Sequence, residues 1–327
     1  MENLLESKNI TKIFSVGGLL SRRRILAVDN VSFSIPAGKP TTTALVGESG
    51  SGKTTIGRLI LGFTKPTSGK ILWQGKDIWK LRGKEWRAYR KNVQAVFQDP
   101  YESLDPRCKI VDTLMEPVEK FRLADSRSEA TKIIADTIES IGLRSEILEK
   151  YPHQVSGGEK QRIMLGRALL IRAKLIVADE PVSMIDASLR ASVLNLMKDI
   201  KSKYDVSFIY VTHDISTAYI LSDYIIITYL GSIMEYGDFD RVVTNPRHPY
   251  VKLLMDSVPI PDPRRKWKET VKLKEREESI PPKDLAKFGS RCKFCDRCAE
   301  VADICWKKPP PAIEIEEGHR ASCFLYA

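Results

Sequence analysis

The sequence predicts an α/β fold built on a parallel sheet, and three patterns carry this prediction. Short apolar runs alternate with helical stretches through residues 175–228, which is typical of βαβ units. A glycine-rich turn joins another apolar run, residues 43–46, to a helix that should begin near Lys53. Within residues 8–37, β-like runs surround a basic insert, so an antiparallel flank should lie beside the parallel sheet.

Residues 99–165 carry a different, helical pattern. Apolar side chains recur at helical spacing in residues 128–141, and this favours a helical subdomain inserted between strands. A stretch rich in proline and lysine, residues 259–283, then predicts a linker. We therefore expect a nucleotide-binding domain over residues 1–258, followed by the linker and a small cysteine-rich domain over residues 259–327.

The charge and hydropathy of the 327 residues limit the possible partners. A formal net charge of +10 favours a polyanion: nucleotide, nucleic acid or an anionic membrane surface. Basic residues at 22–24 and 264–268 could touch lipid headgroups, or simply form a solvated surface. The N-terminus does not resemble a secretory signal, and no apolar run approaches the roughly 20 residues of a membrane span. We expect a peripheral protein on the cytoplasmic face of a membrane.

Residues 47–54, Gly-Glu-Ser-Gly-Ser-Gly-Lys-Thr, fit the P-loop pattern. Glycines let backbone N–H groups turn inward around a polyphosphate, and the following helix adds partial positive charge. Lys53 would reach the β- and γ-phosphates of ATP, and Thr54 would offer its hydroxyl to Mg²⁺. The alternative, a chance match in a glycine-rich loop, is weakened by the strand-to-helix context. The expected ATP-binding residues here are Gly47, Ser49, Gly50, Gly52, Lys53, Thr54 and Thr55.

An apolar run at residues 175–178 ends in Asp179 and Glu180. Ligands bind at the carboxyl ends of strands in open α/β sheets. There Asp179 suits Mg²⁺, and Glu180 could polarise an attacking water as general base. Taken alone, the pattern also fits a strand that enters a polar loop, so its weight depends on the other motifs.

A second anion-binding helix N-terminus is predicted at residues 155–159, Val-Ser-Gly-Gly-Glu. With this motif the sequence resembles the ATP-binding cassette (ABC) ATPases of membrane transporters, whose signature is Leu-Ser-Gly-Gly-Gln. Val155 and Glu159 replace the first and last signature residues. The signature residues expected to contact ATP are Ser156, Gly157, Gly158 and Glu159.

Further positions continue the resemblance in the order of the family, over residues 8 to about 245. Gln98 matches a residue that senses Mg²⁺ and the lytic water, and Asp186 matches another nucleotide-site residue. His213 matches one that contacts the γ-phosphate, although a lone histidine after a strand is otherwise most often structural. Phe14 matches the aromatic that stacks on adenine; its alternative is a core-facing phenylalanine.

The resemblance implies a P-loop NTPase fold of the ABC ATPase type, with a RecA-like parallel sheet, an antiparallel β flank and a helical subdomain. It implies catalysis by positioning and charge neutralisation, in which Lys53, Mg²⁺ and His213 hold the γ-phosphate while Glu180 orients water. ATP would be sandwiched between two cassettes, because each signature completes the site of the facing subunit. Residues 99–106 would dock the membrane subunits.

Four stretches resemble one subfamily, the dipeptide and oligopeptide importers, and in it the second (F-type) ATPase subunit. They are residues 96–107, 151–153, 179–183 and 247–250. Such importers combine two different ATPases, two permeases and an external binding protein, and related systems carry nickel or oligosaccharides. A nucleic-acid-acting cassette ATPase is the alternative from another class, but the spacing between Lys53 and Asp179 leaves no room for long coiled coils. A redox protein with incidental nucleotide binding is a third alternative.

Five of the six cysteines crowd the end of the chain, and Cys108 stands apart. In a reducing compartment such a cluster favours metal ligands over disulfides. The cysteines that match a C-terminal motif of the subfamily are Cys292, Cys298, Cys305 and Cys323. In some members this motif holds a [4Fe–4S] cluster, which we expect here as a structural staple, with zinc or no metal as alternatives. Cys295 is a possible substitute ligand.

Overall fold

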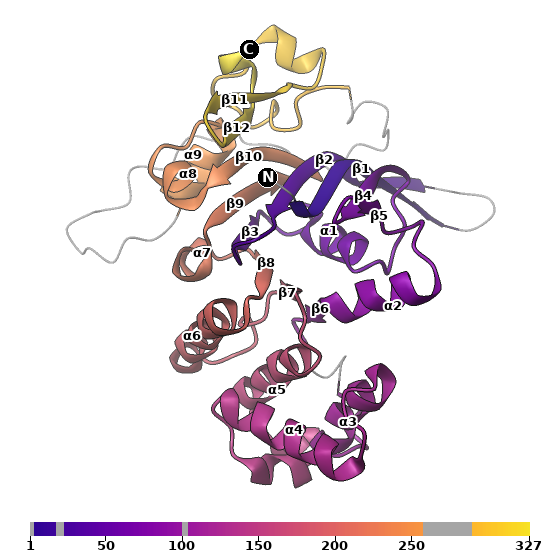
Figure 1. Cartoon of the computed structure of the whole chain (residues 1–327). Helices are drawn as coiled ribbons and strands as arrows, with labels where there is room; N and C mark the ends of the chain where they lie inside the picture. Colours follow the sequence, from indigo (N-terminus) through magenta and orange to yellow (C-terminus); the bar gives the residue numbers. More distant parts are fainter. Residues whose placement is uncertain (1–2, 18–22, 100–103, 258–289) are drawn as a thin grey trace.

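The computed structural model describes residues 3–17, 23–99, 104–257 and 290–327, and its centre is an eight-stranded mixed sheet (Figure 1). The strands are β3 (Thr42–Val46), β6 (Val93–Val96), β7 (Leu175–Asp179), β8 (Ser207–Thr212), β9 (Tyr224–Tyr229), β10 (Ser232–Asp238), β11 (Ala312–Glu316) and β12 (His319–Ser322). Their spatial order is β11-β12-β10-β9-β3-β8-β7-β6. The pairs from β9 to β6 are parallel, as the βαβ pattern predicts.

A smaller antiparallel sheet lies beside the large one, as expected for the N-terminal flank (Figure 1). Its order is β2-β1-β4-β5, from β1 (Asn3–Val16), β2 (Arg23–Pro36), β4 (Ser68–Trp73) and β5 (Lys76–Asp77). In β1, Leu5 and Ser7 are buried whereas Lys8 is exposed, which is the alternation of a strand with one covered face. A register shift at Asn9, where φ is 49°, then brings Ile10 back to the core.

The α-helices are α1 (Lys53–Ile60), α2 (Gly83–Asn92), α3 (Ile110–Phe121), α4 (Arg127–Ser140), α5 (Gly157–Leu170), α6 (Ala187–Tyr204), α7 (Ile215–Leu221), α8 (Phe239–Thr244) and α9 (Pro249–Asp256). In Figure 1, α3, α4 and α5 form a lobe at the far side of β6 and β7 from the C-terminus. Helix α4 buries Ala130, Ile134 and Ile138 at the predicted spacing. Ser126 caps it by accepting a hydrogen bond from the Glu129 amide.

Alternate residues of the central strands face two separate cores. Leu45 of β3 and Val177 of β7 pack with α1, whereas their neighbours Ala44 and Ile176 pack with α5 and α6. All five residues of β3 are buried, as in a strand covered on both faces. The helix after the P-loop and the helix after the signature motif therefore lie on opposite faces of the sheet. Within the described ranges, no helix is long and apolar enough to cross a membrane.

The described part of the cysteine-rich tail, residues 290–327, adds strands to the large sheet. β12 pairs antiparallel with β10, with Glu235 opposite Ala321 and Tyr236 opposite Arg320. The linker and its basic residues 264–268 lie outside the described residues, as do Arg22 and residues 100–103 of the predicted docking segment.

Candidate functional site

The predicted P-loop joins β3 to α1, and close contacts require glycine at two of its positions, Gly47 and Gly52. A Cβ on Gly47 would lie 2.2 Å from the carbonyl oxygen of Thr228, and one on Gly52 would lie 2.4 Å from that of Ala27. Gly52 also has a φ of 95° and precedes α1 without any side-chain cap from the described residues. The first N–H groups of α1 thus have the arrangement that binds phosphate. Ser49, Gly50 and Thr54 are exposed there, and Thr55 is half-buried.

Lys53 is held inside this loop. Its Nζ donates hydrogen bonds to the carbonyl oxygens of Gly47 and Glu48, at 2.7 and 3.0 Å. Burial lowers the pKa of Lys53, and the charges of Glu180, Asp179 and Glu48 raise it again. The ammonium group is therefore within electrostatic reach of the acids at the end of β7.

Asp179 ends β7 and accepts a hydrogen bond from the Thr54 side chain. Burial raises the pKa of Asp179, and the charge of Glu180 adds to this, while the hydrogen bond from Thr54 and the charge of Lys53 lower it. The two side chains form a pair of hard oxygen donors, which is what Mg²⁺ prefers.

Glu180 and His213 are in direct contact. His213 Nδ1 lies 3.0 Å from Glu180 Oε1. Glu180 has a φ of 45°, rare for a residue with a side chain. Its N–H donates to the Val211 carbonyl at 2.9 Å and its carbonyl accepts from the Ser183 hydroxyl at 2.9 Å, so the backbone is fixed on both sides.

Gln98 follows β6 at the border with the helical lobe. The side-chain amide of Gln161, on α5, donates to the carbonyl oxygens of Phe97 and Gln98 at 3.2 and 3.3 Å. Gln161 is buried, so movement of α5 would be transmitted to the backbone of Gln98. Sequence reasoning missed this residue, although it lies only five residues after Ser156.

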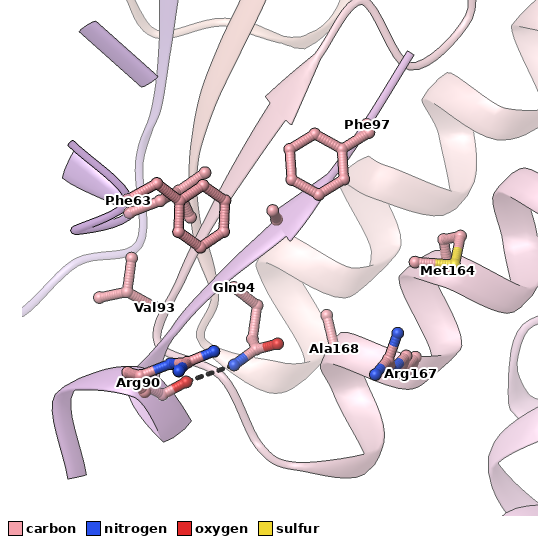
Figure 2. Close-up of a pocket in the computed structure, with 10 residues that line it drawn as sticks. Phe63, Arg90, Val93, Gln94, Phe97, Met164, Arg167 and Ala168 are labelled. Carbon is pink, nitrogen blue, oxygen red and sulfur yellow. Dashed lines mark hydrogen bonds between the residues drawn. The ribbon is translucent and has the colours of Figure 1, made fainter. Parts of the chain in front are cut away.

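A pocket of about 130 Å³ opens between β6 and α5, and Phe97, the residue before Gln98, lines it. Figure 2 shows the rings of Phe63 and Phe97 at its upper end and Arg90 and Arg167 at its lower end. Phe63 is 55% exposed, with its ring centroid 6.2 Å from that of Phe97. Phe97 is half-buried, so the pocket offers one exposed ring and one partly covered ring above two arginines, which suits a partner with both apolar and acidic groups.

The signature motif forms the N-terminus of α5 as predicted. Ser156 Oγ accepts from the Glu159 amide at 3.3 Å, and Glu159 Oε2 accepts from the Ser156 amide at 2.7 Å. The hydrogen bonds that the Glu159 carboxylate accepts from the Ser156 amide and hydroxyl lower its pKa. Gly157 and Gly158 form the first turn of α5. Asp186, which precedes α6, lies near this turn: a Cβ on Gly157 would be 3.7 Å from the carbonyl oxygen of Met184, two residues before Asp186. The helices that follow the two motifs, α5 and α1, pack on opposite faces of the sheet.

Phe14 lies near the end of β1 and is 37% exposed, so its ring is accessible rather than core-facing. The Lys12 ammonium lies 5.0 Å from its ring centroid.

The five C-terminal cysteines line one cavity of about 100 Å³, together with His248 and Phe294. Burial raises the pKa of Cys298 to about 11, and the charges of Cys292, Cys323 and Cys305 raise it too. The Cys305 charge raises the pKa of Cys295, and the Cys295 charge in turn raises the pKa of Cys292, so all five thiols are close enough to interact. Yet no three histidine, cysteine or acidic side chains in the described parts of the chain are arranged to hold a metal ion. The iron–sulfur and zinc sites therefore remain predictions.

Comparisons with known proteins agree with the P-loop and signature geometry. A family model described as "ABC transporter" matches residues 28–183, and one described as "Oligopeptide/dipeptide transporter, C-terminal region" matches residues 234–305. The putative oligopeptide transport ATP-binding protein YkfD of Bacillus subtilis is 37% identical over 99% of this chain and 95% of its own. The oligopeptide transport ATP-binding protein OppF of Escherichia coli is 38% identical, over 92% and 88%.

Solved structures agree as well. The ATP-binding cassette MJ0796, in a dimeric post-hydrolysis state with ADP and Pi, has a TM-score of 0.63 and 26% identity, covering 72% of this chain and 98% of its own. The cbiO1 structure from Clostridium perfringens, at 22% identity and the same TM-score, supports the fold alone, over 75% and 92% of the two chains. The predicted family is confirmed: this chain belongs to the ABC transporter ATPases, in the branch of the oligopeptide and dipeptide transport ATP-binding proteins.

Proposed function

We propose that the chain is the ATP-hydrolysing subunit of a membrane importer of dipeptides and oligopeptides. The observation that carries the proposal is the contact between Glu180 and His213 at the ends of β7 and β8. The charge of Glu180 also acts on the P-loop lysine, Lys53. The names of the relatives, all oligopeptide transport ATP-binding proteins, support peptides as cargo. Importers of nickel or oligosaccharides remain the alternative cargo classes.

In the proposed reaction, Glu180 accepts a proton from water as the water oxygen attacks the γ-phosphorus. The bond from that phosphorus to the bridging oxygen breaks, and ADP and phosphate are the products. Lys53 neutralises the phosphate oxygens, and His213 holds Glu180 and contacts the γ-phosphate. Phe14 is available to stack on the adenine, while Gly47, Gly50 and Gly52 shape the loop around the polyphosphate.

Thr54 and Asp179 fit Mg²⁺, because their two oxygen donors already meet there. Gln98 would complete the site from β6. When bound with ATP, Mg²⁺ would neutralise charge on the phosphates.

A second ABC ATPase subunit would complete the site. The residues that would serve the facing subunit start two helices, α5 and α6, which pack on the other face of the sheet from α1. They are Ser156, Gly157, Gly158, Glu159 and Asp186. MJ0796 forms a dimer in its solved structure, which supports this arrangement. We propose a heterodimer of two related ATPases, with two permeases and, indirectly, an external substrate-binding protein.

The pocket of Figure 2 is the proposed docking surface for a permease at the cytoplasmic face of the membrane. Phe97 lines it, and the Gln161 side chain donates to the carbonyl oxygens of Phe97 and Gln98, so a docked partner could influence the ATP site through this contact. Exposed Arg24 is available to an anionic membrane surface. A nucleic-acid partner is not favoured, since the matched C-terminal region belongs to peptide transporters.

The cysteine cavity is proposed to hold a [4Fe–4S] cluster as a structural staple within a C-terminal domain of residues 259–327. What supports the proposal is that all five C-terminal cysteines line one cavity, where thiolates could reach a bound group. The proposed ligands are Cys292, Cys298, Cys305 and Cys323, with Cys295 as a possible substitute. When bound, such a cluster would cross-link the tail.

The proposed function is tested with the complete transporter in vesicles. Labelled peptide should enter only with ATP and Mg²⁺, and Lys53→Ala should abolish both uptake and ATP binding. A control substitution of a distant surface cation, Lys84→Ala on α2, should leave both intact. Uptake that continues in the Lys53→Ala transporter would contradict the proposal.

A further inference from the structure

Arg297 of the cysteine-rich tail contacts the P-loop directly, although 249 residues separate it from Glu48. Its Nη1 lies 3.0 and 3.1 Å from the two carboxylate oxygens of Glu48, the second residue of the loop. The same nitrogen donates to the Tyr229 hydroxyl at 3.3 Å. The side chains of Arg297 and Glu48 are 27% and 44% exposed, so this ion pair is partly shielded from water.

Aromatic rings hold the guanidinium in place. Its central carbon lies 5.6 Å from the ring centroid of Tyr229 and 5.8 Å from that of Phe294, and these two rings meet edge to face. The Tyr250 hydroxyl accepts a hydrogen bond from the Glu48 amide at 3.3 Å. Glu48 is therefore held by its backbone and by its carboxylate.

Lys293 provides a second link from the tail to the same region. Its almost fully buried ammonium donates to the Leu230 carbonyl at 2.9 Å and pairs with Asp29 at 2.9 Å. The next residue, Gly231, donates its N–H to the Ser51 carbonyl at 3.0 Å. Through Leu230 and Gly231 the tail thus supports the P-loop from the β9–β10 turn as well.

We propose that Arg297 is a positioning residue for the ATP site: by holding Glu48, the tail keeps the P-loop in the shape that receives the polyphosphate. Arg297 also neutralises a carboxylate that would otherwise repel the phosphates. The inference rests on the proposed function, in that the P-loop must bind ATP. It extends that function by making the tail a structural part of the nucleotide site.

A double-mutant cycle on the full-length protein tests the proposal, with a fluorescent ATP analogue as the probe. Arg297→Gln should weaken binding roughly three- to fivefold, the range of a partly exposed ion pair. In a Glu48→Gln background the same substitution should have no further effect. Arg297→Lys should keep the affinity within about twofold of the wild type, because the charge remains.

Arg320→Gln is the matched control, since Arg320 lies on the same tail and pairs only loosely with Glu314, at 3.4 Å. It should leave binding unchanged. If Arg297→Gln weakens binding equally in the wild-type and Glu48→Gln backgrounds, Arg297 acts by attracting the nucleotide from a distance and not by holding Glu48, and the proposal is overturned. No weakening in the wild-type background would overturn it too. A wild-type protein that binds no analogue would contradict the ATPase assignment instead.

Amide hydrogen exchange of residues 47–52 gives a readout that needs no ligand. Exchange should rise in Glu48→Gln, which removes the ion pair without changing any residue of the tail. It should also rise in Arg297→Gln if that variant folds. Unchanged exchange in Glu48→Gln would overturn the proposal.

Discussion

His213 Nδ1 lies 3.0 Å from Glu180 Oε1, and the two residues follow neighbouring strands, β8 and β7. The Glu180 side chain is 19% exposed whereas that of His213 is 59% exposed. The carboxylate is therefore sheltered, and the imidazole covers it from the solvent side. In this arrangement the histidine can orient the carboxylate toward a water molecule without taking the proton itself.

Replacing Glu180 by glutamine should lower the rate of ATP hydrolysis at least about 100-fold, because an amide cannot accept the proton of the attacking water. Binding of ATP should persist, since Lys53, Thr54 and the P-loop are unchanged. Phosphate release by the assembled transporter measures the first effect and nucleotide titration the second. Glu119→Gln, on the exposed face of α3, is the control. Hydrolysis at the full rate in Glu180→Gln would show that Glu180 is not the base.

Replacing Gly47 by alanine should distort the P-loop, because the new Cβ would lie 2.2 Å from the Thr228 carbonyl oxygen. We expect a loss of about 1–3 kcal/mol in the free energy of unfolding, as for other overpacking substitutions, together with weaker ATP binding. Urea denaturation and nucleotide titration measure the two effects.

Gly50→Ala is the matched control, since a Cβ there meets nothing within 4 Å. Only its φ of 78° opposes the substitution, at about 1 kcal/mol. An equal loss of stability in the two variants would contradict the steric argument for Gly47.

The sequence predicts the P-loop and its neighbouring acids because their signals are local. Gly47 to Lys53 form one turn, and Asp179 and Glu180 directly follow one apolar strand, so residue spacing is enough to place them. The helical spacing within α4 was equally readable, because one face of that helix is buried.

The contacts of the tail could not be predicted in this way. Glu235 and His319, both fully buried, meet at 2.7 Å across the junction of β10 and β12. Neither residue lies in a local sequence pattern that predicts a buried polar contact, and 84 residues separate them. Arg297 and Glu48, which are also in contact, are 249 residues apart in the sequence. Such pairs depend on how two distant segments pack, which a pattern of short period does not encode.

Among the cysteines, Cys298→Ser should remove the cluster and Cys295→Ser should not. Both thiols line the same cavity, and only the resemblance to the subfamily motif distinguishes them, because that motif includes Cys298 and passes over Cys295. Iron and sulfide analysis, with the visible absorbance of the purified protein, measures the outcome. Equal iron content in both variants would contradict this choice of ligands, and stoichiometric zinc without sulfide would support the zinc alternative.

His248 should make the stability of the protein depend on pH. It is buried, its Nδ1 accepts a hydrogen bond from the Tyr250 amide at 3.0 Å, and its backbone N–H donates to the Glu235 carboxylate at 2.7 Å. Burial, with a smaller effect of the Lys252 charge, lowers its pKa from 6.5 to about 3. In the unfolded chain the imidazole keeps its ordinary pKa, so below pH 6.5 the unfolded state binds the extra proton and acid favours unfolding.

From about pH 7.5 to about pH 5.5 this group alone should lower the free energy of unfolding by about 1.4 kcal/mol. His248→Asn provides the comparison, because asparagine can still cap α9 but does not titrate. Urea denaturation of both proteins at the two pH values isolates the histidine, since the other titrating groups are common to both. The stability difference between wild type and variant should shift by that amount in favour of the variant at the lower pH. If the difference is the same at both pH values, His248 is not held neutral in the folded protein.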